Sequence, residues 1–468
     1  MMLVVNHYDL VVLGAGSGNI LLGDDLKHLR TAIVEPERFG GTCLNRGCIP
    51  TKMFVVAADA AANARGAARL GVHAEVGSVD WKAIRDRIFD RIDPLHGSAV
   101  RYRVEHGIDV YTEQARFVAP RTVQVGDDRI TADTFVVAAG SRPLVPLIPG
   151  LDEVPYHTSD TVMRIDEFPA SVLIVGGGFI AAEFGHIFAS FGSAVTIVQR
   201  GQTLLPAEDE DVSATFTELA AERHRVLLGR EVASVRKDGT GIAASVTGPA
   251  GETTVHAELL LICTGRVPNT DLLDAKAVGL ELDGHGHIVT DDEYRTSVPY
   301  IWALGDAADH FQLKHMANAE VRVVAHNLTH PDDTRCLTNR VAPHAVFTDP
   351  QIASVGITEQ QARERGIEHV VSTRRYADTA YGWALEDTHS FVKLIADPDS
   401  RTLLGAHILG PHAAILIQPL IQAMTLGQSV DRIARGVLYI HPALSEVVEQ
   451  ALLDLPPPSP KAGRSIDK

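Results

Sequence analysis

Short runs of apolar residues that end in glycine or other small residues recur along this chain of 468 residues. The clearest runs lie at 8–13, 31–34, 134–139, 172–175, 195–198 and 259–263. Continuous apolar runs of this length, bounded by turn residues, are typical of strands that are buried on both faces. Because segments with helical spacing follow several of them, the pattern predicts an α/β fold built from strand–helix–strand units.

Helical spacing of apolar residues is clearest in three segments. The segment 78–107 predicts one long helix, which we assign to ordinary core packing; its apolar positions are Trp81, Ile84, Ile88 and Ile92. A second helix is predicted to begin just after Cys48 and to run on through Ala58, because Pro50 suits the first turn of a helix. The apolar residues at 20–22 and 26 predict a third helix. Beyond about Cys336 the pattern changes to short strands alternating with helices.

The first apolar run leads into a glycine-rich turn that indicates a dinucleotide site. Gly14 permits the tight turn, and Gly16 lets the backbone approach a pyrophosphate. Glu35 ends the next predicted strand, at the distance along the chain where a carboxylate accepts hydrogen bonds from ribose. Asn19 stands at the third glycine position of the fingerprint. We expect this departure to disturb helix–strand packing more than phosphate binding.

A second glycine-rich turn follows the run at 172–175 and predicts a second dinucleotide site. Gly176 and Gly178 stand in the fingerprint positions, and a predicted helix continues to residue 191. Gln199 and Arg200 follow the next strand, where a site for NAD would carry an acidic residue. A guanidinium there can pair with a 2′-phosphate, so the sequence favours NADPH.

Two cysteines beside a predicted helix start carry the candidate redox chemistry. Cys43 and Cys48 are separated by four residues, so a disulfide between them closes a short ring. A structural bridge stabilises most when it closes a long loop, which disfavours a structural staple or two unpaired core cysteines. A thiolate at a helix start has a lowered pKa, and its neighbour can then exchange with a substrate disulfide.

His441 and Glu446 form a second candidate centre. A histidine can accept a proton from an attacking thiol and return it to a leaving thiolate, while a carboxylate orients the imidazole. Alone, this spacing would more often be a coincidence of the surface. Together with the cysteine pair and two nucleotide motifs, it predicts an acid–base dyad. Cys263 lies in an apolar run and is interpreted as a core residue.

Composition limits the partners. The formal net charge of −17 disfavours nucleic acid and anionic membranes as partners. No apolar run reaches the length of a membrane span, and the start of the chain lacks a basic region followed by an apolar segment. With only four cysteines the chain is not a secreted disulfide scaffold, so we expect a cytoplasmic protein. The proline-rich tail from 456 to 468 is predicted to be disordered.

The stretch from Gly40 to Lys52 resembles the redox site of the flavoprotein disulfide reductases, the family of glutathione reductase and dihydrolipoamide dehydrogenase. The resemblance covers nearly the whole chain. It implies two Rossmann-like dinucleotide-binding domains, an α+β C-terminal dimerisation domain, FAD and NADPH as cofactors, a small-molecule disulfide substrate and a homodimer. The domains implied are FAD-binding at 1–150 and 265–335, NADPH-binding at 151–264 and dimerisation at 336–455.

The resemblance also assigns residues. Lys52 and Glu183 would pair beside the flavin, and Asp306 would accept a hydrogen bond from the ribityl chain. Cys43 would exchange with substrate while Cys48 faces the flavin, and the dyad of His441 and Glu446 would serve the partner subunit's disulfide. Further backbone positions assigned to cofactor binding are Gly41, Thr42, Gly140 and Gly265.

The substrate is the open question within this resemblance. A mercuric reductase would carry another cysteine pair near its C-terminus, and a dihydrolipoamide dehydrogenase would favour NAD. A glutathione reductase would place an arginine where this chain has Asp24 and Asp25. Stretches at 16–19, 51–55, 157–165, 381–388 and 417–424 are similar to a branch of the family that acts on a hydroxyl-rich sugar thiol. A flavin-containing redox sensor is the alternative that is not an enzyme, and the retained cysteines, His441 and Glu446 disfavour it.

Overall fold

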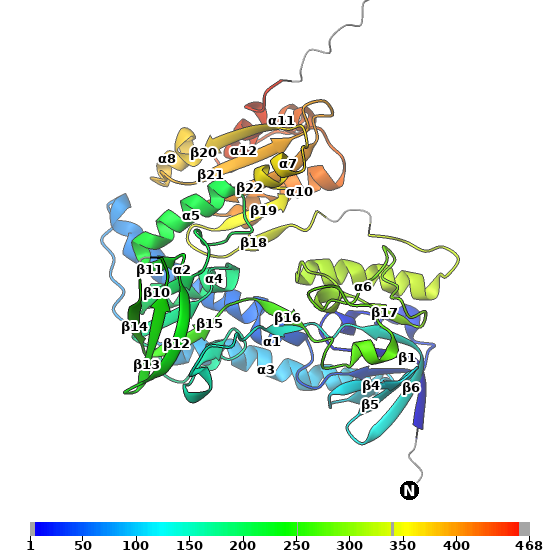
Figure 1. Ribbon diagram of the computed structural model, residues 1–468. Helices are drawn as coiled ribbons and strands as arrows, with labels where there is room; N and C mark the ends of the chain where they lie inside the picture. The colour runs from blue at the N-terminus through cyan, green and yellow to red at the C-terminus, as the bar shows by residue number, and fades with distance from the viewer. Residues whose placement is uncertain (1–4, 250, 338–340, 458–468) are drawn as a thin grey trace, which may run out of the picture.

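A mixed sheet forms the first part of the computed structural model, which describes residues 5–249, 251–337 and 341–457. Its strand order is β3-β2-β1-β6-β5-β4, and β17 pairs with β6 (Figure 1). The strands are β1 Val5–Leu13, β2 Thr31–Val34, β3 Asp109–Tyr111, β4 Ala115–Ala119, β5 Thr122–Val125, β6 Asp128–Val137 and β17 Ile301–Ala303. The central strands are parallel, so their carboxyl ends meet at one edge, where ligands bind in folds of this kind.

The helix predicted at 20–26 is wrong. The chain forms only two three-residue 3₁₀ turns there, Gly18–Ile20 and Asp24–Leu26, because Gly23 and the polar residues after it interrupt the apolar pattern. Gly18 packs against the strands: a Cβ on it would lie 2.7 Å from the Cβ of Ala138. Gly18 therefore provides the close packing that Asn19 would obstruct.

A second parallel sheet follows, with the order β11-β10-β9-β15-β8 and an antiparallel β12-β13-β14 sheet beside it. Its elements are β8 His157–Thr158, β9 Ser171–Val175, β10 Ala194–Gln199, β11 Arg225–Leu228, β12 Glu231–Asp238, β13 Gly241–Thr247, β14 Thr253–Ala257, β15 Leu259–Ile262, α4 Phe179–Phe191 and α5 Glu210–Arg223. Two short strands, β7 Ser141–Pro143 and β16 Arg266–Pro268, pair where the chain leaves and re-enters the first sheet. This architecture confirms the two Rossmann-like units.

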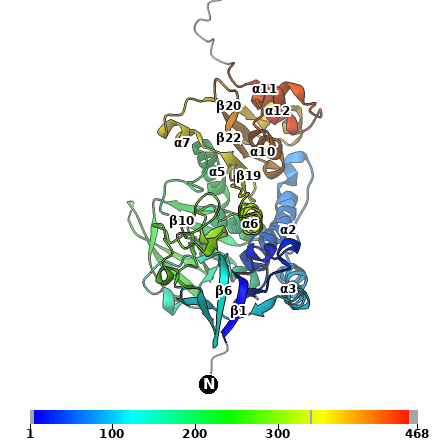
Figure 2. The same ribbon diagram turned by 90° about the vertical axis from the view of Figure 1, so that its right-hand side faces the viewer.

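The last part is α+β, as predicted. Its antiparallel sheet has the order β18-β19-β22-β21-β20. The strands are β18 His344–Val346, β19 Ile352–Gly356, β20 Val370–Arg375, β21 Phe391–Ala396 and β22 Leu403–Leu409, and the helices are α7 Glu359–Glu364, α8 Ala380–Ala384, α9 Ala413–Leu416, α10 Gln418–Thr425, α11 Val430–Gly436 and α12 Ser445–Leu453. Figures 1 and 2 place this part at one end of the molecule, opposite the N-terminus.

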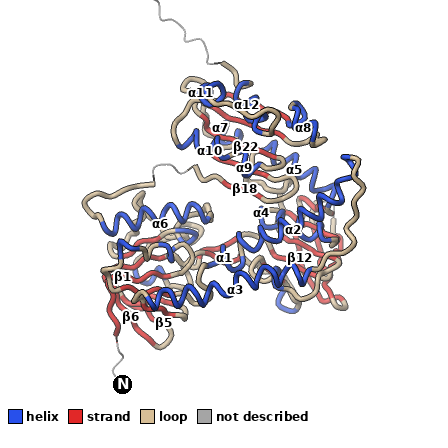
Figure 3. Tube along the Cα trace, turned by 180° about the vertical axis from the view of Figure 1, so that it is seen from behind, coloured by secondary structure: helices blue, strands red, loops and turns tan. Residues whose placement is uncertain are grey.

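Helices α2 Cys48–Gly66 and α3 Trp81–Glu105 connect the first two parts of the molecule (Figure 3). Trp81 stacks on Phe54 with ring centroids 4.9 Å apart and on Phe188 of α4 at 6.1 Å. Its indole N–H donates to the carbonyl of Ile165 at 2.9 Å. This shared aromatic core fixes α2 against α4 and so positions the residues at the start of α2.

Two of the residue assignments made from the sequence concern positions that the structure does not describe. Residues 458–468 of the predicted tail, and the side chain of Asp24, lie outside the described residues. Among the helices that the structure describes, none is both long enough and apolar enough to cross a membrane.

Candidate active site

The two cysteines meet where two helices join. Cys43 lies in the short helix α1 Gly41–Arg46, and Cys48 is the first residue of α2. Gly47 joins the helices, and a Cβ on it would lie 2.9 Å from the carbonyl oxygen of Thr42. A larger residue would therefore separate the two helices. Both cysteines are free thiols, so the structure shows the reduced form of the pair.

The two sulfur atoms have different acidities. The thiol of Cys43 donates a hydrogen bond to the sulfur of Cys48, which lowers the pKa of Cys48 to about 7. Burial opposes this shift, and the ammonium of Lys52 supports it. The same hydrogen bond, together with burial, raises the pKa of Cys43 far above its usual value. Near neutral pH, Cys48 therefore carries the thiolate and Cys43 keeps the proton.

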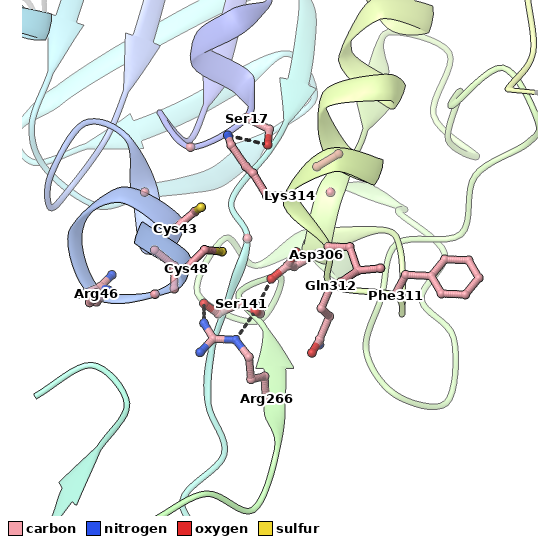
Figure 4. Close-up of a pocket in the computed structure, with 18 of the residues that line it drawn as sticks. Ser17, Cys43, Arg46, Cys48, Ser141, Arg266, Asp306, Phe311, Gln312 and Lys314 are labelled. Carbon is pink, nitrogen blue, oxygen red and sulfur yellow. Dashed lines mark hydrogen bonds between the residues drawn. The ribbon is translucent and has the colours of Figure 1, made fainter. Parts of the chain in front are cut away.

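A cavity of about 1200 Å³ extends from these sulfurs along the carboxyl ends of the first sheet (Figure 4). A Cβ on Gly14 would lie 2.2 Å from the carbonyl oxygen of Ala138, and one on Gly41 would lie 2.7 Å from the Cα of Gly16. Because these glycines carry no side chain, two backbone segments can pack closely together in the cavity wall. Glu35 lies at the far end, where burial raises its pKa and the backbone N–H of Ala15 donates to it at 2.8 Å. The dimensions and donors fit a dinucleotide, with Thr42 and Gly140 also in the wall.

Lys52 and Glu183 form the predicted pair. The ammonium lies 2.5 Å from both carboxylate oxygens, joining α2 to α4. Glu183 is buried and also accepts from the backbone N–H of Phe347 at 3.0 Å. The ring of Phe347 lies 4.7 Å from the ammonium. One fixed charge pair therefore lies four residues along α2 from the Cys48 thiolate.

A series of hydrogen-bonded polar side chains along the cavity was not predicted from the sequence. The hydroxyl of Ser141 donates to Asp306 at 2.6 Å, and the Nε of Arg266 donates to that hydroxyl at 2.8 Å (Figure 4). Arg266 is surrounded by protein atoms, and burial lowers its pKa. It lies near Asp160, which also pairs with Arg46 at 3.2 Å. These residues are far apart in sequence; the pairing of the crossover strands β7 and β16 brings Ser141 and Arg266 together.

The second glycine turn precedes α4, and only α4 reaches the cavity: Gly176 and Gly178 are not among the described residues that line it. A Cβ on Gly176 would lie 2.2 Å from the carbonyl oxygen of Cys263, so the turn requires glycine there. Gly178 caps α4, whose first residues Phe179 and Ile180 line the cavity. Arg200 follows β10 with an exposed side chain, away from the described cavity wall.

Gly265, Cys263 and Cys336 are not among the described residues that line the cavity. Gly265 has a positive φ of 111° at the crossover before β16, and it is absent from the described residues that line the cavity. Cys263 is buried, and burial raises its pKa well above the usual range, as expected of an unreactive core thiol. Cys336 is exposed.

His441 and Glu446 form a dyad that lies away from the cysteines of its own chain. The Nδ1 of His441 and the Oε1 of Glu446 are 2.7 Å apart, and the side chain of His441 is 74% exposed. The hydrogen bond to His441 lowers the pKa of Glu446. Neither residue is among the described residues that line the cavity. Exposed apolar side chains precede the dyad at Val437, Leu438 and Ile440.

Comparison with known proteins gives the family. Residues 8–322 match the model of the pyridine nucleotide-disulphide oxidoreductases, and residues 342–452 match the dimerisation domain of the same family. The chain belongs to this family. Pyridine nucleotide-disulphide oxidoreductases are enzymes that combine FAD with a nicotinamide cofactor, which agrees with the two glycine-rich strand-to-helix turns of this chain.

Several members of this family are similar over nearly the full chain. Mycothione reductase of Mycobacterium tuberculosis (strain ATCC 25618 / H37Rv) is 46% identical over 96% of this chain and 99% of that protein. A mercuric reductase of Streptomyces lividans is 35% identical over 92% of each chain. A dihydrolipoyl dehydrogenase of Haloferax volcanii is 34% identical over 95% of each. Among solved structures, the HOCl-induced flavoprotein disulfide reductase RclA from Escherichia coli has a TM-score of 0.83 at 26% identity, covering 95% of this chain and 99% of that one.

Proposed function

We propose that this enzyme uses NADPH to reduce mycothione, the disulfide of mycothiol, through FAD and a redox disulfide between Cys43 and Cys48. The observation that carries the chemistry is the acidity difference between the two sulfurs at the end of the cavity. The substrate rests on the 46% identity with mycothione reductase over nearly the full chain.

Different residues in the wall of the cavity would bind different parts of FAD. Gly14, Gly16 and Gly41 leave room for the pyrophosphate, and Glu35 would accept hydrogen bonds from the adenosine ribose. Asp306 would accept a hydrogen bond from the ribityl chain. Bound there, FAD supplies a two-electron carrier between the nicotinamide and the cysteines. The ammonium of Lys52, held by Glu183, would stabilise negative charge on the reduced ring. Thr42, Gly140 and Gly265 would provide further backbone contacts.

The disulfide exchange uses the two cysteines together with a histidine–glutamate dyad. The reduced Cys43 sulfur attacks one sulfur of the substrate disulfide, forms a mixed disulfide with it and releases the first thiolate. The Cys48 thiolate then attacks the Cys43 sulfur, which forms the internal disulfide and releases the second thiolate. His441 would take the proton from Cys43 and return it to a leaving thiolate, while Glu446 stabilises the imidazolium.

NADPH would bind along the second glycine turn, at Gly176 and Gly178, with Arg200 near its 2′-phosphate. Because His441 is exposed and lies away from the cysteines of its own chain, the complete site requires a homodimer in which each dyad serves the partner's cysteines. A thiol-reducing enzyme of this acidic composition would act in the cytoplasm.

Steady-state kinetics with three disulfides and two nucleotides tests the proposal. We expect NADPH with mycothione to give the highest kcat/KM among mycothione, glutathione disulfide and lipoamide, each measured with NADPH and NADH. A preference for lipoamide with NADH would instead make the chain a dihydrolipoyl dehydrogenase, and a preference for glutathione disulfide would make it a glutathione reductase. Absence of turnover with every disulfide would favour a redox sensor.

A further inference from the structure

The first glycine turn lacks the helix that normally follows it. In dinucleotide sites of this type, the positive end of a helix dipole faces the pyrophosphate. Here the turn leads into 3₁₀ segments of three residues each, Gly18–Ile20 and Asp24–Leu26. So few aligned peptide groups give only a small dipole. The two negative charges of a pyrophosphate would therefore need another source of positive charge.

Lys314 reaches this turn from the other end of the sequence. It is the first residue of α6 Lys314–Thr329, and its ammonium donates to the hydroxyl of Ser17 at 3.0 Å. The same hydroxyl donates to Asn318, one turn along α6, at 3.3 Å. Figure 4 shows the side chain of Lys314 crossing the cavity towards Ser17. The glycine turn thus receives its cation from α6.

The ammonium has no carboxylate partner among the described residues. The ammonium donates to the Ser17 hydroxyl, while Asp306, a carboxylate of the same cavity, accepts from Ser141. Burial lowers the pKa of Lys314, and the charges of Cys43, Cys48 and Asp306 oppose that shift only from a distance. A half-buried cation without an anion is less favourable than one whose negative charge is supplied by a ligand.

A second cation supports the turn from outside the cavity. The guanidinium of Arg103 on α3 contacts the backbone carbonyl of Asn19 at 3.0 Å and its side-chain oxygen at 3.0 and 2.5 Å. The residue that replaces the third glycine is therefore tied to α3. This contact holds the shape of the turn, whereas Lys314 contacts the turn from inside the cavity, through Ser17.

We propose that Lys314 binds the pyrophosphate of FAD and supplies the positive charge that the shortened segment after β1 cannot. The inference rests on the proposed use of FAD. The position of the ammonium favours the pyrophosphate over the flavin ring, since its hydrogen-bond partner Ser17 lies between Gly16 and Gly18 of the phosphate turn. Ser17 then orients both the ammonium and the turn.

Binding of FAD to the full-length apoprotein tests the assignment. Flavin is removed from the wild type, Lys314→Met, Lys314→Arg and Lys82→Met, and FAD is added back with fluorescence quenching as the readout. Lys82 is exposed at the start of α3 and serves as the matched control. We expect Lys314→Met to weaken FAD binding roughly 10- to 100-fold, as for loss of a charge-assisted hydrogen bond. Lys314→Arg should recover most of the affinity, and Lys82→Met should match the wild type.

ADP distinguishes the pyrophosphate from the flavin ring, because it carries the first group without the second. In competition with FAD, the Lys314→Met substitution should weaken the binding of ADP by about the same factor as it weakens the binding of FAD. If ADP binds both proteins equally while the flavin potential of Lys314→Met shifts, the lysine acts on the ring and the proposal is wrong. If the wild type itself binds no FAD, the proposed function fails instead.

Amine labelling of the wild-type apoprotein gives an answer that does not depend on the variant's folding. With mass spectrometry as the readout, ADP should protect Lys314 from an acylating reagent and leave Lys82 equally reactive. Equal labelling of Lys314 with and without saturating ADP contradicts the proposal.

Discussion

At the scale of single residues, the chemistry depends on one hydrogen bond between two sulfurs. The Cys43 thiol is the largest cause of the lowered pKa of Cys48, which is about 7. A Cys48 thiolate beside oxidised flavin should give a long-wavelength charge-transfer band. The band should appear without added reductant in Cys43→Ser, where a hydroxyl still donates, and should be lost as the pH falls and the thiolate is protonated.

Cys43→Ala is the matched comparison, since it removes the donor and keeps Cys48. Its band should disappear at a higher pH than that of Cys43→Ser, because Cys48 then has the higher pKa. A spectrophotometric pH titration of both variants gives the two midpoints. Equal midpoints would show that the helix start and Lys52 set the acidity. A band in Cys48→Ser and none in Cys43→Ser would reverse the roles of the cysteines.

Arg200 tests the choice of nucleotide. A charge-assisted contact with the 2′-phosphate is worth about 1.5–3 kcal/mol. Arg200→Ala should therefore raise the KM for NADPH roughly 10- to 100-fold and leave the KM for NADH nearly unchanged. Arg225→Ala, an exposed arginine in the same sheet, serves as the control. An equal loss with both nucleotides would mean that Arg200 only shapes the pocket.

Residues in local motifs could be predicted from the sequence, and residues joined by the fold could not. Cys43 and Cys48 belong to one short stretch, and the spacing of the two cysteines in the sequence already indicates a redox disulfide. Lys52 and Glu183 were paired only through the family resemblance, and the structure places them 2.5 Å apart. Ser17 and Lys314 are 297 residues apart and carry no local pattern that links them.

At the scale of elements, buried strands were predicted best. The run at 31–34 coincides with β2, and the run at 259–263 extends one residue beyond β15, because a short apolar run between turn residues readily forms a buried strand of a parallel sheet. The helix predicted at 20–26 was wrong because Gly23 and the polar residues after it interrupt the apolar pattern; the 3₁₀ turns that form instead bury Leu21 and Leu26 and leave Ile20 exposed. The antiparallel β12-β13-β14 sheet was missed, since its outer strands β12 and β14 are half-buried and lack continuous apolar runs.

The end of α5 gives a prediction of pH dependence. His224 follows α5 beside Arg223 and His186, in a second cavity that Arg65 also lines. Burial lowers its pKa to about 4, and the proximity of Arg223 and His186 adds to this shift. The unfolded chain binds this proton at a pKa near 6.5, so between about 6.5 and 4 the unfolded state holds more protons than the folded state. This histidine therefore removes stability as the pH falls through that window, by at most about 1.4 kcal/mol per pH unit.

Replacing His224 by an uncharged residue should remove the loss of stability that this histidine causes as the pH falls. The melting temperature of His224→Gln should fall less steeply than that of the wild type between pH 6.5 and 4.5, as measured by differential scanning calorimetry. His73→Gln, at an exposed position, is the control and should follow the wild type. Parallel curves for all three proteins would show that His224 is protonated equally in the folded and unfolded chain.

At the scale of the whole molecule, the acid–base dyad and the cysteines lie on different parts of one protomer. Leu438 is 98% exposed and Ile440 is 75% exposed, next to a histidine on the family's dimerisation domain. Adjacent exposed apolar side chains are typical of a surface that another subunit covers. Such an interface would bring His441 to the partner's cysteines and would bury these side chains at the same time.

Mixed dimers can show whether each active site is shared. Loss of His441 should reduce disulfide turnover roughly 10²- to 10⁴-fold, while reduction of the flavin by NADPH survives. A dimer of one Cys43→Ser subunit and one His441→Ala subunit is isolated with two affinity tags. If each site takes its cysteines and its histidine from opposite chains, both lesions fall in one site and the other stays intact, so about half of the wild-type activity remains. If each site is built within one chain, both sites are damaged and activity should be near zero, which would reject the shared site.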